Sequence, residues 1–250
     1  MTAAGRRPLV AANWKMHLVR AEAAEFCRAL LAEELPATVD VALFPSFPLL
    51  PAVVEALVGS TVAAGAQDLR PEPAGAFTGD VSAAQLVDCG CRFVICGHSE
   101  RRLLHGEDDA LVAAKARAAL AAGLVPIVCV GESREERRGG QTFDVLARQL
   151  EPLPVDPRLV LAYEPLWAIG TGETASPDTA ADAHAYLRSR IERRAGSESA
   201  ALLRILYGGS VTPENAGALG RENDVDGFLV GGASLDPKRF RAIISSLAVA

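Results

Sequence analysis

The sequence predicts an α/β protein in which parallel strands close into a barrel and helices form an outer layer. Short apolar runs alternate eight times with longer, alanine-rich amphipathic segments, and no linker or low-complexity stretch interrupts them. The first run ends in Asn13, Trp14 and Lys15, where a doubly wound sheet usually carries a glycine-rich dinucleotide motif. We therefore expect a single (β/α)8 barrel domain over residues 1–250, with a doubly wound open sheet as the alternative.

Strands are expected at the short apolar runs, which are bounded by turn-forming residues. In chain order these runs span residues 9–13, 39–44, 61–66, 92–96, 124–130, 159–163, 203–207 and 227–230. Strands that alternate with helices are parallel and joined by right-handed crossovers, so their carboxyl ends meet at one face of the barrel. We expect the functional side chains at that face.

Helices are expected in the amphipathic segments between and after the strands. They span residues 21–35, 48–58, 82–89, 107–122, 142–150, 176–194, 213–219 and 237–247. Three of them have a clear start, because Ser176, Thr212 and Asp236 each place a capping oxygen before a proline at the first helical position.

Composition and charge narrow the possible partners. A net charge of -6 and a pI near 5.3 argue against nucleic acid or an anionic membrane. The five cysteines form no C-x-x-C pair with histidines at metal spacing, so we expect core side chains, no bound metal and a reducing compartment. No apolar run approaches the ~18 residues of a membrane span, and the polar start is unlike a signal peptide, so we expect a soluble cytoplasmic protein.

Chemically useful residues gather at the expected strand ends. The sixth strand stops at Glu164, a carboxylate that is costly to desolvate at the end of an apolar run. The other strand ends carry Asn13 and Lys15; Gly97, His98, Ser99 and Glu100; Gly208, Gly209 and Ser210; and Gly231 and Gly232. Each residue alone has an ordinary explanation as a solvated charge, a structural histidine or a turn glycine. Together, on one face of one barrel, they indicate a single site.

The segment after Glu164 has the composition of a lid. A proline stiffens its start, Trp167 and Ile169 give it an apolar face, and Gly170 and Gly172 allow close approach to an anion. The expected lid comprises Pro165, Leu166, Trp167, Ala168, Ile169, Gly170, Thr171, Gly172, Glu173, Thr174 and Ala175. The alternative is a rigid connection whose tryptophan fills the core.

Five motifs in these regions resemble the triosephosphate isomerase family. They are AANWKM at 11–16, GHSERR at 97–102, AYEPLWAIGTG at 162–172, YGGS at 207–210 and LVGGAS at 229–234. They cover the whole chain in the order and spacing of the family. The resemblance implies the (β/α)8 TIM barrel fold and an aldose-ketose isomerase of glycolysis and gluconeogenesis, without cofactor or metal. Its reaction interconverts dihydroxyacetone phosphate and D-glyceraldehyde 3-phosphate through an enediol(ate).

The resemblance also implies a role for each site residue. Glu164 is the base that moves the proton, and His98 is the electrophile that polarises the carbonyl group. Lys15 supplies positive charge in contact with Glu100, and Asn13 positions the substrate. Backbone N–H groups hold the phosphate, and they belong to Gly170, Ser210, Gly231 and Gly232.

The chemistry requires such residues, because removal of a proton next to a carbonyl group develops negative charge on its oxygen. The site therefore needs one base and several donors that face this oxygen. A glutamate is a weak base at its ordinary pKa of about 4.3, so we expect burial under the lid to raise the pKa of Glu164.

The segment from Gln67 to Asp80 is longer than an ordinary connection from a strand to a helix. In the family, the matching loop enters a second subunit, where Thr78 reaches the active site near Asn13 and Lys15. The resemblance therefore implies a homodimer, with Met16, Gly75, Phe77, Thr78 and Gly79 at the contact. The alternative is a surface loop packed on itself.

Three residues depart from the family pattern, and none is catalytic. His17 replaces a common asparagine, Glu173 replaces a common lysine at the end of the lid, and Cys96 replaces an aliphatic residue. Two other functions remain as alternatives, a related isomerase of a four-carbon ketose phosphate and an inactive barrel that only binds ligands. An inactive barrel would be expected to have lost Lys15, His98 or Glu164, and all three are present.

Overall fold

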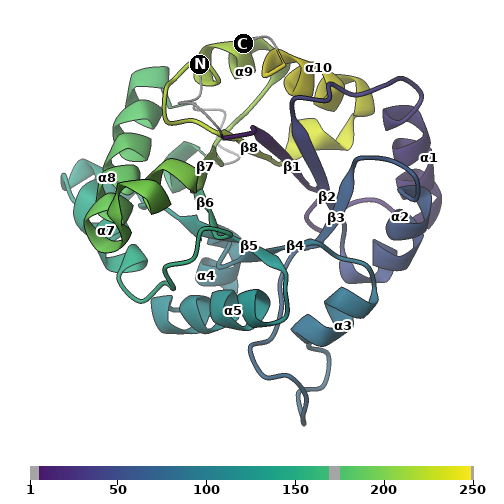
Figure 1. The fold of residues 1–250 in the computed structure, drawn as a ribbon, viewed down its shortest axis with the longest axis horizontal. Helices are drawn as coiled ribbons and strands as arrows, with labels where there is room; N and C mark the ends of the chain where they lie inside the picture. The colour runs from purple at the N-terminus through teal and green to yellow at the C-terminus, as the bar shows by residue number, and fades with distance from the viewer. Residues whose placement is uncertain (1–5, 169–174, 249–250) are drawn as a thin grey trace.

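Eight parallel strands close into a barrel in the computed structural model, which describes residues 6–168 and 175–248 (Figure 1). The strands are Leu9–Asn13 (β1), Asp40–Phe44 (β2), Ala63–Ala66 (β3), Phe93–Cys96 (β4), Val125–Val130 (β5), Val160–Tyr163 (β6), Arg204–Tyr207 (β7) and Gly227–Val230 (β8). Each strand pairs with its neighbour in sequence, and β8 pairs with β1 to close the sheet. The predicted fold class is confirmed.

The barrel has an apolar interior and an apolar outer layer, because successive side chains of each strand point to opposite faces. The interior is filled by Leu9, Ala11, Ala42, Phe44, Phe93, Ile95, Ile127, Cys129, Val160, Ala162, Leu206 and Leu229. Gly65 makes room for one of the two phenylalanines, since a Cβ at this position would lie 2.3 Å from Cε1 of Phe44. The other strand side chains pack against the helices.

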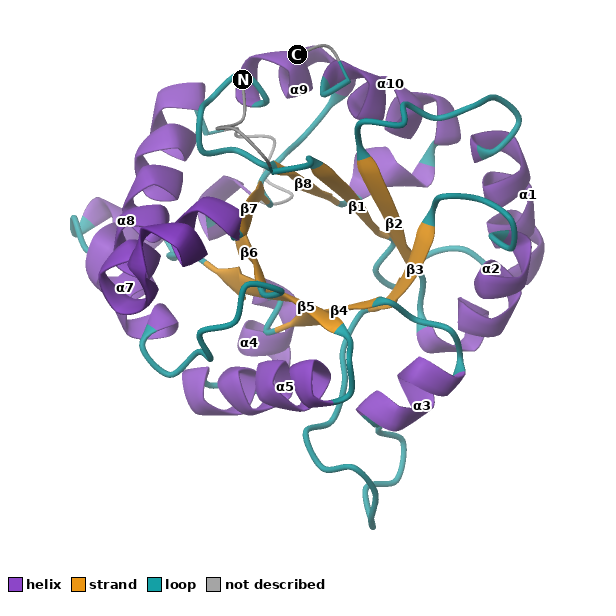
Figure 2. Cartoon of the chain, in the orientation of Figure 1, coloured by secondary structure: helices purple, strands orange, loops and turns teal. Residues whose placement is uncertain are grey.

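Helices surround the barrel as a ring (Figure 2). They are Arg20–Leu30 (α1), Leu50–Ala56 (α2), Ala83–Asp88 (α3), Ser99–His105 (α4), Asp109–Ala121 (α5), Arg134–Arg138 (α6), Thr142–Leu150 (α7), Pro177–Leu202 (α8), Pro213–Leu219 (α9) and Pro237–Ser246 (α10). Short 3-10 turns form Phe47–Leu49 (η1), Leu166–Ala168 (η2) and Gly232–Leu235 (η3). No helix in the described ranges is long and apolar enough to cross a membrane.

Two of the three expected caps are confirmed. Ser176 accepts a hydrogen bond from the N–H of Thr179, and Asp236 accepts from the N–H groups of Lys238 and Arg239. At the start of α9, Thr212 occupies the N-cap, but its side-chain oxygen accepts no capping hydrogen bond from the described backbone and its own N–H makes the contact instead. The N–H of Thr212 donates to the Asn215 side-chain oxygen at 2.8 Å.

The predicted end of one helix was wrong. Helix α1 ends at Leu30, because the Arg241 guanidinium binds the carbonyl oxygens of Leu30 at 2.6 Å and Glu33 at 2.9 Å. Helix α8 is broken at Gly196, whose φ of +83° and ψ of +164° are not helical, so its first part ends close to the predicted end at Arg194 and a second part continues to Leu202. Helices α4 and α6 were not predicted, because they are too short to show a clear apolar period.

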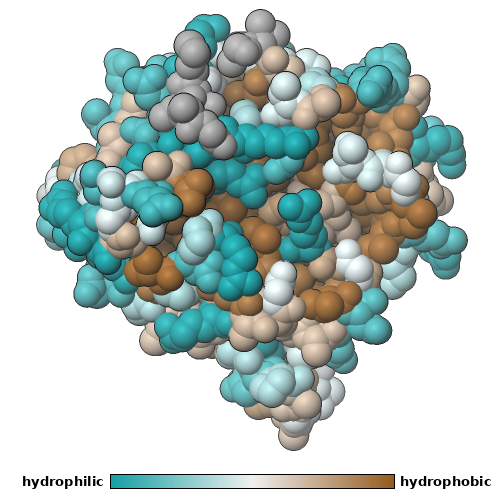
Figure 3. Space-filling model, viewed as in Figure 1, coloured by the Kyte–Doolittle hydropathy of each residue, from teal (hydrophilic) through white to brown (hydrophobic). Residues whose placement is uncertain are grey.

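The loop between β3 and α3 extends away from the ring of helices (Figure 1). In the space-filling view it projects from the body of the molecule with side chains of mixed polarity (Figure 3). It contains Thr78 and Gly79, which are exposed, and Phe77, whose ring lies 4.2 Å from the Arg70 guanidinium carbon. The loop expected from its length is therefore present as a projection.

Candidate active site

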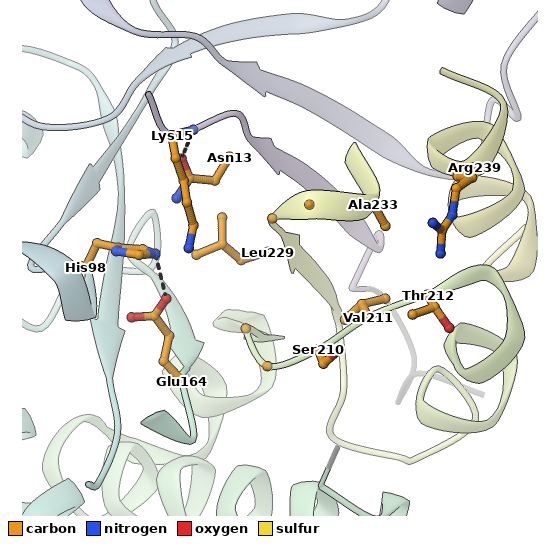
Figure 4. Close-up of a pocket in the computed structure, with 14 residues that line it drawn as sticks. Asn13, Lys15, His98, Glu164, Ser210, Val211, Thr212, Leu229, Ala233 and Arg239 are labelled. Carbon is orange, nitrogen blue, oxygen red and sulfur yellow. Dashed lines mark hydrogen bonds and ion pairs between the residues drawn. The ribbon is translucent and has the colours of Figure 1, made fainter. Parts of the chain in front are cut away.

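A cavity of about 270 Å³ opens at the carboxyl ends of the strands (Figure 4). Its walls come from the ends of β1, β4, β6, β7 and β8 and from the first turn of α10. It is lined by Asn13, Lys15, His98, Glu164, Gly208, Gly209, Ser210, Val211, Thr212, Leu229, Gly231, Gly232, Ala233 and Arg239. Most of the strand-end residues predicted from sequence therefore share one cavity. Gly97, Ser99 and Glu100 do not line it, although Glu100 contacts Lys15 from outside, and Gly170 lies outside the described residues.

Lys15 enters the cavity from an unusual backbone conformation just after β1. Its φ of +49° is rare for a residue other than glycine, and two hydrogen bonds hold it. The Lys15 N–H donates to Oδ1 of Asn13 at 3.0 Å, and the Lys15 carbonyl accepts from Nε2 of Gln67 at 2.7 Å. The Lys15 ammonium lies 2.6 Å from Oε1 of Glu100, which is the contact implied by the family resemblance.

His98 occupies the N-cap of α4, and this position determines which ring nitrogen carries hydrogen. The N–H of Glu100 donates to Nδ1 at 3.2 Å, so the hydrogen of the neutral ring lies on Nε2. Nε2 is 3.1 Å from Oε1 of Glu164 (Figure 4). Burial lowers the pKa of His98, but the nearby carboxylates of Glu164 and Glu100 outweigh burial and the net shift is upward.

Glu164 is 2% exposed at the end of β6, and both of its carboxylate oxygens have donors. Oε2 accepts the N–H of Ser99 at 2.9 Å, and Oε1 faces His98. Burial raises the pKa of Glu164, but His98, the Ser99 N–H and Lys15 together lower it below the usual value. The expectation of a raised pKa was therefore wrong for this arrangement, because donors to the charged form outweigh desolvation.

The opposite wall of the cavity is made of small residues after β7 and β8. A Cβ on Gly208 would lie 2.9 Å from Cγ of Glu164, so the loop passes close to the carboxylate. Asn215 holds the Ser210 carbonyl at 3.0 Å, and the Ser234 hydroxyl holds that of Gly231 at 2.7 Å. Within the described part of the chain, the N–H groups of Ser210 and Gly232 donate no hydrogen bond and remain available for an anion.

Only the two ends of the expected lid can be placed. Pro165, Leu166, Trp167, Ala168 and Ala175 are described, whereas Ile169, Gly170, Thr171, Gly172, Glu173 and Thr174 lie outside the described residues. The Trp167 indole N–H donates to Oε1 of Glu132 at 2.9 Å, and the Arg137 guanidinium lies 4.4 Å from its ring. Trp167 is half-buried against the outer core, so it does not occupy the barrel interior.

The residues expected at a dimer contact do not line the active-site cavity. Met16 is 94% exposed, and Gly75, Phe77, Thr78 and Gly79 lie in the projecting loop. A second cavity of about 490 Å³ adjoins the first, and Asn13, Lys15 and His98 line both. Its other walls are Met16, His17, Gln67, Glu100, Arg101, Leu104 and His105.

Three contributions to the site were not predicted from the sequence, two of them from residues that the sequence did not single out. The Ser99 N–H binds Glu164, although Ser99 stood in a motif already identified. Glu132 binds Trp167, and nothing in the sequence links these two residues. Arg239 lines the cavity from α10, and an arginine in the first turn of a surface helix gives no signal of its own.

Among the described residues, no group of three histidine, cysteine or acidic side chains is placed to bind a metal ion. Four of the five cysteines are buried and Cys89 is half-buried, as expected for core side chains. Cys96 is fully buried, and this burial raises the pKa of its thiol.

Comparison with known proteins gives a consistent result. The model of the family described as triosephosphate isomerase matches residues 8–247. A triosephosphate isomerase from Symbiobacterium thermophilum is 50% identical over 252 residues, with 98% of each chain covered. The one from Thiobacillus denitrificans is 51% identical, with 97% of this chain and 99% of that protein covered. The one from Bordetella pertussis is 48% identical, with 98% and 99% covered.

Proposed function

Because this chain belongs to the triosephosphate isomerase family, we propose that its strand-end cavity interconverts dihydroxyacetone phosphate and D-glyceraldehyde 3-phosphate. The observation that carries this proposal is the convergence of Glu164, His98 and Lys15 on one cavity that also contains the glycine loops. One end of the cavity offers a base and donors, and the other offers free N–H groups for a phosphate.

Glu164 is the base in this proposal. Its carboxylate removes a proton from the carbon beside the carbonyl group, and the electron pair of that bond moves to the carbonyl oxygen to form the enediolate. Glu164 then returns the proton to the neighbouring carbon. In the arrangement described here, Ser99 and His98 engage both carboxylate oxygens, so at least one of these bonds must be released for Glu164 to reach the substrate.

His98 and Lys15 stabilise the charge that develops on the substrate oxygens. The Nε2–H of His98 can donate to an oxygen in the cavity once Glu164 turns toward the substrate. The Lys15 ammonium lies at the same end, and the bonds to Asn13 and Gln67 fix its backbone before substrate binds. Donors that are already oriented stabilise a transition state without reorganisation, which is commonly the main source of an enzyme's rate enhancement.

The phosphate belongs at the loops after β7 and β8. The proposed ligands are the N–H groups of Ser210, Gly231 and Gly232, with Gly170 of the lid completing the set. Small residues let the backbone approach the anion closely, and η3 places a helical N-terminus beside it. No atom of the described residues requires glycine at 231 or 232, since a Cβ there would meet only Lys15 at 3.6 Å or open space, so in this proposal the missing side chains leave room for the ligand.

The proposal includes a homodimer of chains that each form one domain over residues 1–250. The exposed Met16, the projecting loop and the second cavity beside Asn13 and Lys15 support the dimer, because the loop of one subunit could fill the cavity of another. The free cysteines support a reducing, cytoplasmic setting, and the acidic net charge argues against nucleic acid or an anionic membrane as a partner.

Steady-state kinetics with D-glyceraldehyde 3-phosphate test the function. We expect a fast wild type and a loss of about a hundredfold or more in kcat for Glu164→Asp, since displacement of a catalytic group by about 1 Å can cost that much. A slow wild type, or a variant equal to it, would contradict the proposal. Turnover of a four-carbon ketose phosphate in the same assay distinguishes the related isomerase.

A further inference from the structure

The active-site cavity continues past the glycine loops to a region that the isomerase reaction does not require. Beyond Ser210 and Gly232 its walls are Val211, Thr212 and Ala233, and Arg239 closes this end. The Arg239 side chain extends from α10 between Ala233 and Thr212 (Figure 4). A cation therefore stands at the far end of the cavity from Glu164 and His98.

The backbone at Arg239 is firmly placed, whereas its side chain is unengaged. Asp236 accepts hydrogen bonds from the N–H groups of Lys238 at 2.8 Å and Arg239 at 2.9 Å, which fixes the first turn of α10. The guanidinium of Arg239 makes no hydrogen bond or ion pair with residues 6–168 or 175–248. Arg241 on the same helix is different, because it binds Glu33 and the carbonyl of Leu30.

The charges around the cavity make this free guanidinium significant. At the chemical end, the Lys15 ammonium is already paired with Glu100 at 2.6 Å, and Glu164 adds a second carboxylate. At the far end, the charge of Arg239 acts on the carboxylate of Glu214 in the first turn of α9. A hydrogen bond with Thr212 is the main cause of the lowered pKa of Glu214, and the charge of Arg239 contributes less.

We infer that Arg239 forms an outer anion subsite, which binds a second anionic group of small molecules whose first phosphate lies on the loops after β7 and β8. The guanidinium presents donors in a planar fork that matches the oxygens of a phosphate or carboxylate. The ligand class is compact bisphosphates and phosphorylated acids, which would compete with the substrate. The triose phosphate substrate has a single phosphate and leaves the outer subsite empty.

This inference rests on the proposed phosphate site, and competition by two simple anions tests both. The probes are inorganic phosphate, with one anionic group, and inorganic pyrophosphate, with two. Their inhibition constants against D-glyceraldehyde 3-phosphate are measured at constant ionic strength with a chelator present. We expect wild type to bind pyrophosphate at least tenfold more tightly than phosphate.

The subsite is located by comparing variants for the ratio of the inhibition constant of phosphate to that of pyrophosphate. Arg239→Gln is expected to reduce the preference for pyrophosphate by tenfold or more, and Arg239→Lys by less, since it keeps the charge and loses the fork. Lys238→Gln is the matched control, because it removes the same charge from the same helical turn and does not line the cavity. It is expected to leave the ratio within about twofold of wild type, as an exposed charge is largely screened.

Two outcomes would overturn the inference. Equal ratios in wild type and Arg239→Gln would show that Arg239 binds no second anion. Equal reductions in Arg239→Gln and Lys238→Gln would show an effect of net charge alone. A wild type in which neither anion competes with substrate would instead contradict the phosphate site and, with it, the proposed function. Arg239 is exposed, so its replacement should preserve the fold, which circular dichroism of each variant checks.

Discussion

Two buried carboxylates lie at opposite ends of the barrel, and their surroundings differ. Asp226 precedes β8 and is fully buried, with Oδ1 2.7 Å from the Arg6 guanidinium and Oδ2 2.7 Å from that of Arg188. The N–H of Ile205 also donates to Oδ2 at 2.9 Å. Glu164 follows β6 and is buried to a similar degree, but it lines a cavity and its donors are a backbone N–H and a histidine ring.

The difference shows that partners and open space, more than burial, distinguish a structural carboxylate from a reactive one. Asp226 is enclosed by the guanidinium groups of Arg6 and Arg188, so its negative charge is balanced by ion pairs whether or not a substrate is bound. Glu164 has partners that can be exchanged for a substrate, and it has space to move into. The carboxyl ends of barrel strands are where such freedom serves chemistry, and the amino ends serve stability.

The largest effect is expected when the charge of the structural carboxylate, Asp226, is removed. Asp226→Asn keeps the shape of the side chain and removes the fully buried counter-ion of Arg6 and Arg188, which leaves both guanidinium groups with only the partly exposed Asp224 as a counter-ion among the described residues. We expect a loss of about 3–5 kcal/mol in the free energy of unfolding, as for other broken buried ion pairs. Urea unfolding measures this loss, and kcat at a temperature where the variant is folded should remain within about threefold of wild type.

Asp156→Asn is the control for this prediction. Asp156 also pairs with an arginine, Arg158, at 2.8 Å, but in a partly exposed loop. An exposed pair contributes about 1 kcal/mol or less, so this variant should be almost as stable as wild type. Equal losses for the two variants would show that enclosure by two cations is not what makes Asp226 important.

The next largest effect distinguishes two buried histidines, His98 in the active-site cavity and His184 in the packed structure outside it. His98→Gln removes the ring that faces Glu164, and we expect kcat to fall on the order of a hundredfold, about 2.7 kcal/mol of activation free energy. His184→Gln changes a fully buried histidine whose Nδ1 lies 2.9 Å from the Asp224 carbonyl. Burial lowers the pKa of His184 to about 4, so glutamine preserves its neutral state at pH 7.

We expect His184→Gln to lose about 1–3 kcal/mol of unfolding free energy and to keep kcat within about threefold. Steady-state kinetics and urea unfolding of both variants give the comparison. A large kcat loss in His184→Gln with normal stability would mean that a buried histidine can matter for catalysis without lining the cavity, which would contradict the comparison. An active His98→Gln would remove this histidine from the mechanism.

The same contrast explains how far the sequence could predict the molecule. The strands were predictable because a parallel strand inside a barrel is apolar on both faces, so a run such as Leu9–Asn13 stands out. The end of α1 was not, because it depends on Arg241 from the far end of the chain. A contact over this sequence distance leaves no periodic signal near Leu30.

The site divides in a similar way. Residues whose side chains carry the chemistry, such as Lys15 and Glu164, could be predicted because their types and strand-end positions are informative. The direction of the pKa of Glu164 could not, because it depends on the N–H of Ser99 and on the ring of His98, whose placement only the fold determines. Arg239 was missed because its meaning comes from the cavity it faces and from the absence of partners for it among the described residues.

The smallest expected effect tests the charge state of the reactive carboxylate through pH. The pKa of Glu164 is lowered in the folded protein, so its ionised form stabilises the fold above its ordinary pKa of about 4.3. That contribution is lost as the pH falls through the lower folded value. We therefore expect the stability of wild type relative to Glu164→Gln to be greatest above about pH 5 and to shrink on acidification.

A raised pKa, as the sequence predicts for a glutamate buried by a lid, reverses the sign. The ionised carboxylate would then destabilise the fold at neutral pH. The free energy of unfolding of wild type would rise relative to that of Glu164→Gln as the pH falls toward about 4.3. Urea unfolding of both proteins from about pH 7 to about pH 3.5, at one protein concentration because association adds to apparent stability, separates the two signs. A difference that grows on acidification would mean that desolvation, and not the donors from Ser99 and His98, controls Glu164 in the free enzyme.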